Sequence, residues 1–111
     1  MSPGGRLPYL RGTAFERRVR DDLRKRGYEV IRSAGSKTVI DLVAIGTGDD
    51  TRDLIFCQCK KDGRLDPAER DELCELAVIA SADAVLAEMP KAGGIRYSVV
   101  FKVGQKMAAE V

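Results

Sequence analysis

Three polar side chains of types that can do chemistry stand at or within apolar segments of this 111-residue chain: Asp41, Gln58 and Lys60. Asp41 interrupts the apolar segment 39–45, where an unpaired carboxylate is costly, so a functional role explains it better than a structural one. The chain contains no histidine, which removes chemistry that pairs histidine with serine, with cysteine or with a metal ion. Any hydrolysis would therefore depend on carboxylates, lysine and a hard cation.

Two neighbouring predicted strands would bring these side chains together. Segments 39–45 and 53–60 are both predicted to be strands, joined by the glycine-rich turn 46–50. Side chains alternate between the two faces of a strand. One face of the second strand would therefore carry Leu54, Phe56, Gln58 and Lys60. Asp41 on the adjacent strand would lie at the same edge of the sheet, although the amide and the lysine could also be ordinary solvent-facing residues at a strand end.

The rest of the chain predicts two helices and three further strands. The first helix is expected from Thr13, whose spacing to Glu16 matches a capping box. The second is expected from Asp66, a capping aspartate followed by a proline and a glutamate in the first turn. Further strands are expected at 28–31, 84–87 and 95–101. The resulting order, α-β-β-β-α-β-β, predicts an α/β fold in which helices flank a mixed β-sheet.

Length and composition favour one intracellular domain. Residues 1–11, which include two prolines and two glycines, are expected to be a flexible leader, and residues 12–111 a single domain. No apolar run approaches the roughly 20 residues that cross a bilayer, and no signal peptide is evident, so a cytoplasmic protein is expected. Three cysteines without a histidine favour neither a disulfide framework nor structural zinc.

Positive charge is concentrated in the first part of the chain. Residues 1–40 contain ten Lys and Arg against four Asp and Glu, whereas residues 41–111 contain nine against thirteen. Many of the basic residues fall on the first predicted helix: Arg17, Arg18, Arg20, Arg24, Lys25 and Arg26. Such a concentration suits a polyanion such as a phosphate backbone, although arginine-rich helix faces also occur simply for solubility.

Four short segments resemble successive motifs of archaeal-type Holliday junction resolvases, which belong to the PD-(D/E)xK nuclease superfamily. They are Gly12-Thr13-Ala14-Phe15-Glu16-Arg17, Arg32-Ser33-Ala34-Gly35-Ser36-Lys37, Asp41-Leu42-Val43-Ala44 and Gln58-Cys59-Lys60-Lys61. The resemblance runs from Gly12 to the second helix, and the last two strands match only in pattern. It implies a restriction-endonuclease-like fold. It also implies an endonuclease that nicks opposed strands of four-way DNA junctions and leaves a 5′-phosphate and a 3′-hydroxyl.

The resemblance further implies metal-assisted hydrolysis in which the metal ion is Mg²⁺, with Mn²⁺ able to substitute. The metal contacts that it implies are Asp41, Gln58, Glu16 and the backbone carbonyl of Cys59. Lys60 would lie beside the attacking water and stabilise charge on the phosphate, and Ser36 would help to order substrate or metal. Glu16 has an alternative structural role, because the capping box with Thr13 would satisfy two helix donors without any metal.

The partners that the resemblance implies are DNA and a second copy of the chain. Contacts with DNA are expected from Arg11, Arg17, Arg32, Ser33, Ser36, Lys37 and Lys61. Without the resemblance, segment 33–37 would be interpreted as an ordinary turn. A homodimer is expected, because resolving a four-way junction requires two symmetrically placed cuts. The sequence fits a cellular enzyme and a virus-encoded one equally.

Gln58 is the main departure from the family pattern, since most relatives have glutamate or aspartate there. An amide oxygen can coordinate Mg²⁺ but carries no charge, so the site would hold the metal more weakly than an acidic one. Some Mrr-type restriction nucleases of the same superfamily resemble this Gln-x-Lys variant. Two alternatives therefore stay open: a restriction-like or repair nuclease, and a DNA-junction-binding protein whose catalytic site is impaired.

Overall fold

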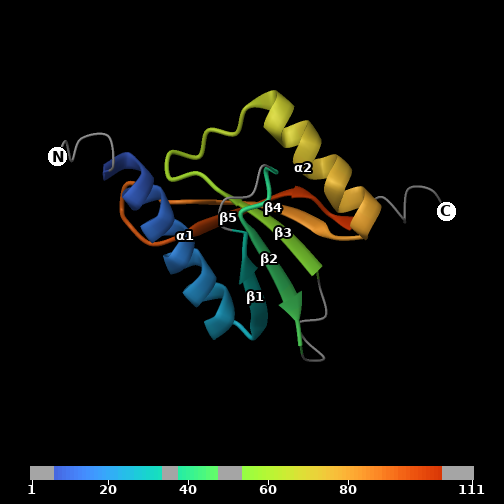
Figure 1. Cartoon of the computed structure of the whole chain (residues 1–111), viewed down its shortest axis with the longest axis horizontal. Coiled ribbons are helices and arrows are strands. Elements are labelled where there is room, and N and C mark those ends of the chain that lie inside the picture. The colour runs from blue at the N-terminus through green and yellow to red at the C-terminus, as the bar shows by residue number, and fades with distance from the viewer. Residues whose placement is uncertain (1–6, 34–37, 48–53, 104–111) are drawn as a thin grey trace.

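A five-stranded mixed β-sheet forms the centre of the molecule, and one helix packs on each of its faces (Figure 1). The computed structural model describes residues 7–33, 38–47 and 54–103, with side chains from residue 13 onward. The helices are α1 (Leu7–Lys25) and α2 (Pro67–Ala80). The strands are β1 (Tyr28–Arg32), β2 (Leu42–Gly46), β3 (Leu54–Cys59), β4 (Asp83–Glu88) and β5 (Arg96–Phe101). The predicted order of elements is confirmed.

The strands lie side by side in chain order, β1-β2-β3-β4-β5. Neighbouring strands pair antiparallel except β3 and β4, which are parallel. A parallel pair requires a crossover connection, and α2 provides it along one face of the sheet. Cys59 at the end of β3 pairs with Ala87, and the backbone N–H of Lys60 donates to the Ala87 carbonyl at 2.9 Å. Pairing with β4 therefore holds the backbone in place where the predicted site residues of β3 lie.

Each helix buries apolar side chains against a different face of the sheet. The core on the α1 face comprises Phe15, Val19, Leu23, Val30, Leu42, Ala44, Cys57, Val85 and Ala87. The core on the α2 face comprises Val39, Leu73, Ala77, Ala82 and Ala84, with Leu54 and Phe56 packed against it. The predicted alternation along β3 is thereby confirmed, since Cys57 faces α1 whereas Phe56 faces α2.

The first helix begins earlier than predicted. α1 starts at Leu7, so the predicted capping box of Thr13 and Glu16 is wrong, and both residues lie inside the helix. Pro8 is compatible with this start, because the first turn of a helix leaves backbone N–H groups unpaired and proline has none to lose. Residues 7–11 of the expected leader are consequently helical, whereas residues 1–6 lie outside the described part of the chain.

The start of the second helix agrees with the prediction. Asp66 caps α2 in an extended backbone conformation, and Pro67 is the first helical residue. The side-chain Oε1 of Glu69 accepts the backbone N–H of Asp66 at 3.4 Å. Because only residues 60–65 connect β3 to this cap, the first turn of α2 stays near the end of β3 (Figure 1).

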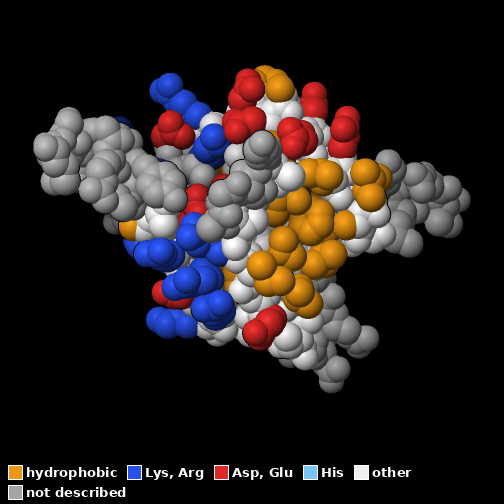
Figure 2. All heavy atoms as spheres, viewed as in Figure 1, with side chains coloured by type: hydrophobic (Ala, Val, Ile, Leu, Met, Phe, Trp, Pro, Cys, Tyr) orange, Lys and Arg blue, Asp and Glu red, His pale blue; other side chains and the backbone are white. Residues whose placement is uncertain are grey.

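Part of the sheet on the α2 side stays uncovered. α2 packs mainly on β3, β4 and β5, so β1 and β2 expose hydrophobic side chains there. Ile31 is 56% exposed, Ile45 is 39% exposed and Ile79 of α2 is 80% exposed. Figure 2 shows hydrophobic side chains gathered over the strands next to α2. We call the surface formed by Ile31, Ile45 and Ile79 the apolar face. Within the described ranges, no helix is both long and apolar enough to cross a membrane.

Candidate active site

Asp41 is held by backbone hydrogen bonds on both sides just before β2 begins. Its N–H donates to the carbonyl of Cys57 at 2.9 Å, and its own carbonyl accepts the N–H of Ser33 at 2.9 Å. The hydroxyl of Ser33 also donates to the carbonyl oxygens of Ile40 and Asp41. Strand pairing was predicted to begin at residue 39, and the structure places the start of β2 at Leu42. Asp41 is therefore at a strand end rather than inside a strand, but its backbone is fixed.

The carboxylate of Asp41 connects β2 with the end of β3. Its Oδ2 accepts the backbone N–H of Cys59 at 2.8 Å. Burial raises the pKa of Asp41 to about 6, although the hydrogen bond from Cys59 opposes this shift. The neighbouring charges of Glu16 and Glu69 raise the pKa further, and the charge of Lys60 lowers it. Asp41 thus lies within electrostatic reach of three charged side chains, which come from α1, from α2 and from the connection that follows β3.

Gln58 is buried on the α2 face, at 5% exposure. Its Nε2 donates to Oε2 of Glu69 at 3.3 Å. In the part of the chain that the structure describes, its Oε1 is buried without any hydrogen-bond partner. A buried amide oxygen without a donor is costly, so a ligand or a water that contacts Oε1 would relieve this cost.

Lys60 forms an ion pair with the first turn of α2. Its Nζ lies 3.2 Å from Oε2 of Glu69, and both side chains are about one-third exposed. Burial raises the pKa of Glu69, but the hydrogen bond and the charge of Lys60 outweigh it, so the pKa lies below its usual range. Glu69 is therefore ionised at neutral pH, and it contacts both Gln58 of β3 and Lys60, which directly follows β3.

Sequence reasoning missed this role of Glu69 and treated the residue only as part of a helix cap. The carboxylate does both, because Oε1 contacts the N–H of Asp66 while Oε2 contacts Gln58 and Lys60. The sequence nevertheless contained a sign of the contact with Gln58 and Lys60. Only a few residues separate the predicted strand from the predicted helix cap, so the first turn of the helix must lie close to the end of that strand.

Glu16 reaches the site from α1 but is paired with a cation. Its Oε1 lies 2.9 Å from Nη1 of Arg32, and both side chains are largely buried. Arg32, which was predicted to contact DNA, therefore neutralises Glu16 here. The electrostatic effect of Glu16 on Asp41 places the glutamate near the site, as the family resemblance implied, while its role as a metal contact stays a prediction.

The oxygen atoms at the end of β3 fit a hard cation. Among the described residues, no three His, Cys, Asp or Glu side chains are grouped so that they could hold a metal ion. The donors that remain are the carboxylate of Asp41 and the unpartnered Oε1 of Gln58, which are oxygen ligands of the kind that Mg²⁺ takes. The Cys59 thiol does not fit, because the hydrogen bond with Cys57 and burial raise its pKa and keep it protonated.

Basic and acidic side chains lie on different parts of the surface. Figure 2 shows Lys and Arg gathered over α1 and Asp and Glu gathered over α2. Arg20 and Arg26 are engaged with Asp21 and Asp22. The exposed basic residues of α1 without an ion pair among the described residues are Arg17, Arg18, Arg24 and Lys25, although Arg24 donates a hydrogen bond to the carbonyl of Val30. Lys61 is also exposed. The predicted contacts Ser36 and Lys37, and the side chain of Arg11, lie outside the described residues.

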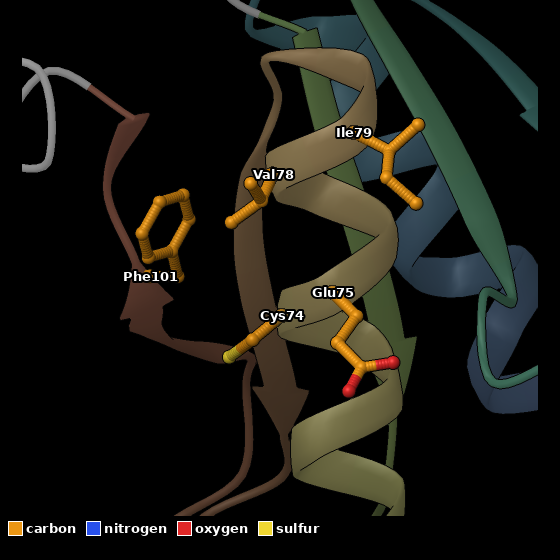
Figure 3. A pocket seen from close by; sticks show the side chains of 5 residues that line it. All are labelled: Cys74, Glu75, Val78, Ile79 and Phe101. Carbon is orange, nitrogen blue, oxygen red and sulfur yellow. The ribbon is translucent and has the colours of Figure 1, made fainter.

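A separate apolar groove lies between α2 and β5, with a volume of about 540 Å³. Its apolar lining residues are Cys74, Val78, Ile79 and Phe101 (Figure 3). Its one charged lining residue is Glu75. The groove lies along the later turns of α2, whereas Glu69 in the first turn marks the site at the end of β3. Its apolar and acidic lining does not suit a phosphate.

Comparisons with known families and with solved structures both indicate the same protein family. A sequence model of the family described as archaeal Holliday junction resolvase (Hjc) matches residues 8–109. Among solved structures, the chain is similar to the 1.6 Å structure of Hjc from Archaeoglobus fulgidus, a Holliday junction resolvase from an archaeal hyperthermophile. The two share 30% sequence identity with a TM-score of 0.68, and the match covers 81% of this chain and 73% of that chain. A search of curated protein sequences gave no significant match.

Proposed function

The chain belongs to the archaeal Holliday junction resolvase family, and from this premise we propose that it is a metal-dependent endonuclease that resolves four-way DNA junctions. The five-stranded mixed sheet with its two helices is the restriction-endonuclease-like fold of that family. The observation that carries the proposal is the meeting of an acid and a lysine at one sheet edge. The carboxylate of Asp41 accepts the N–H of Cys59, the residue directly before Lys60.

The residues that would hold the metal ion are Asp41, through its carboxylate, and Gln58, through Oε1. The backbone carbonyl of Cys59 and the carboxylate of Glu16 are the further contacts that the family resemblance implies. When bound, Mg²⁺ or Mn²⁺ supplies charge neutralisation at the phosphate and lowers the pKa of a bound water. The buried Oε1 of Gln58, which has no hydrogen-bond partner in the described part of the chain, supports this assignment.

Lys60 would act on the phosphate and on the attacking water. Its ammonium group is held at the site by the ion pair with Glu69, and it would orient the water and stabilise the charge that develops on the phosphate oxygens. The water oxygen would form the new bond to phosphorus and release a proton to solvent, while the bond to the 3′ oxygen breaks and that oxygen takes up a proton from solvent. The products are a 5′-phosphate and a 3′-hydroxyl.

The basic surface would contact the DNA backbone. Arg17, Arg18, Lys25 and Lys61 are exposed in the structure, and lysine and arginine gain affinity for DNA by releasing counterions from phosphates. Contacts from Arg11, Ser36 and Lys37 stay predictions. Arg32 and Ser33 make intramolecular contacts here, so their main contribution would be to position Glu16 and Asp41.

A homodimer would supply the two symmetrically placed cuts that resolution requires. The apolar face formed by Ile31, Ile45 and Ile79 supports this, because an exposed hydrophobic patch on a small domain is typical of a protein interface. A two-fold dimer through this face would leave the basic surface over α1 free for DNA (Figure 2).

The proposal is tested with a synthetic four-way junction in Mg²⁺. We expect paired, symmetric nicks with ligatable 5′-phosphates, which Lys60→Ala abolishes, and little cutting of a linear duplex of the same sequence. Equal cutting of both substrates would indicate the restriction-like or repair alternative. Tight junction binding without cleavage in Mg²⁺ or Mn²⁺ would indicate a binding protein and would contradict the proposed activity.

A further inference from the structure

Position 58 leaves the proposed site short of one negative charge. Strand β3 presents a neutral amide there, and the other two motif residues are Asp41, directly before β2, and Lys60, directly after β3. A divalent cation is bound more tightly as more of its oxygen ligands are charged. Glu16, the other acid proposed for the metal, is paired with Arg32 at 2.9 Å, so the site needs a further carboxylate if it is to hold metal as an acidic site would.

We propose that Glu69, from the first turn of α2, supplies the acidic metal-binding group that position 58 lacks; this inference rests on the proposed function. Its Oε2 lies 3.3 Å from Nε2 of Gln58 and 3.2 Å from Nζ of Lys60. A carboxylate from α2 thus lies beside both Gln58 of β3 and Lys60, which directly follows β3. The negative charge is delivered from the helix instead of from the strand.

The identity of residue 58 fits this arrangement. The Gln58 amide donates through Nε2 to Glu69, which leaves Oε1 buried and without a donor among the described residues. A glutamate at position 58 would place two carboxylates at about this separation, and like charges so close disfavour each other's ionised form. Glutamine at 58 and glutamate at 69 are therefore complementary, and the amide orients the carboxylate while offering its own oxygen.

Helix capping alone does not account for the position of Glu69. The cap uses Oε1, whose distance to the N–H of Asp66 is 3.4 Å, at the long end of hydrogen bonds. Both shorter contacts are made by Oε2 and point to β3. Other acidic residues of α2, including Glu72, are exposed and provide matched controls on the same helix.

The test measures metal binding directly, by calorimetric titration of the full-length protein with Mn²⁺ and with Ca²⁺. We expect Glu69→Gln to weaken binding by about 10- to 100-fold, and Glu72→Gln to leave it unchanged. The exchange variant Gln58→Glu/Glu69→Gln has the same net charge as the wild type and returns the acid to the strand. It should recover most of the binding, whereas Gln58→Glu alone should gain little because of charge repulsion.

A further variant separates metal binding from the positioning of Lys60. Lys60→Met breaks the ion pair but keeps Glu69, so it should bind Mn²⁺ at least as well as the wild type while losing cleavage. Unchanged Mn²⁺ binding in Glu69→Gln would overturn the proposal, as would an exchange variant that is folded by circular dichroism but does not recover binding. A wild type that binds Mn²⁺ through Glu69 but cuts no junction would contradict the proposed function and leave this inference standing.

Discussion

The carboxylate of Asp41 and the backbone N–H of Cys59 are joined by a 2.8 Å hydrogen bond across the end of the β2–β3 pair. This bond fixes the acid relative to the residues on either side of Cys59, which are Gln58 and Lys60. The backbone of Asp41 is held in turn by Cys57 and Ser33. The acid is therefore preorganised before any ligand arrives. Because burial disfavours its ionised form, the charge of Asp41 lowers the free energy of unfolding.

Asp41→Asn is expected to stabilise the metal-free protein. The pKa of Asp41 is about 6 in the folded chain against an ordinary value of 3.8, so the folded state binds more protons between these values and loses stability as the pH rises through them. The cost is complete above about pH 6. Two pKa units correspond to at most about 3 kcal/mol, and partial solvent exposure reduces the expected gain to about 1–2 kcal/mol.

Urea unfolding in EDTA at pH 8 and at pH 4 measures this gain. It should be present at pH 8 and nearly absent at pH 4, where Asp41 is largely protonated, and Asp71→Asn on the exposed side of α2 serves as control. A variant that is less stable than the wild type at pH 8 would contradict a raised pKa. With Mg²⁺ added, only the wild type should gain further stability.

Lys60→Ala is expected to lower the rate of junction cleavage at saturating Mg²⁺ by at least about 100-fold, because the variant loses the cation that stabilises the phosphate charge. Junction affinity should change far less, since one ammonium group is a small part of the contact with DNA. Single-turnover cleavage and a gel-shift titration measure the two quantities. Lys91→Ala, an exposed residue of the turn before β5, is the control, and an equal loss in both variants would speak against a specific role.

Arg17→Ala and Lys25→Ala are expected to weaken junction binding and to reduce its dependence on salt. Each lost phosphate contact should lower the slope of log affinity against log salt concentration by about 0.9. Arg96 on β5 is paired with Glu88 at 2.7 Å, so Arg96→Ala should leave the slope as it is. If all three variants behaved alike, the basic surface over α1 would not be the DNA-binding surface.

Ile79→Glu is expected to dissociate the proposed dimer without unfolding the subunit, because the side chain is 80% exposed. Analytical ultracentrifugation measures the mass, and a supercoiled cruciform substrate shows whether the two nicks are made within one binding event. The variant should sediment as a monomer and leave singly nicked circles. Val99 is 61% exposed and pairs with Val85, which belongs to the core on the opposite, α1 face of the sheet. It gives the control Val99→Glu. A wild type that is already monomeric would refute this assignment of the apolar face.

The parts of the fold that depend on local sequence were predictable. Asp66, Pro67 and Glu69 begin α2 through local capping, and the alternation along β3 correctly put Phe56 and Cys57 on opposite faces. The start of α1 was wrong because Thr13 and Glu16 imitate a local cap, whereas Pro8 is tolerated in the first turn.

The contacts between elements were harder to predict. The ion pair of Glu16 with Arg32 and the contact of Glu69 with β3 depend on how a helix packs on the sheet. No spacing within a single segment carries that information. The basic residues of α1 that are proposed to contact DNA could be told apart from the paired ones only when the ion pairs of Arg20 and Arg26 were known.

The contact of Glu69 with Lys60 has a consequence for how nuclease motifs are recognised. A motif search that requires an acid two residues before the lysine discards this chain, because it considers only the spacing within one strand. The same charge reaches the lysine from the third position of the next helix, across a connection of a few residues. A pattern that accepts the acid either on the strand or in the first turn of the next helix, with glutamine on the strand in the second case, would retain this chain.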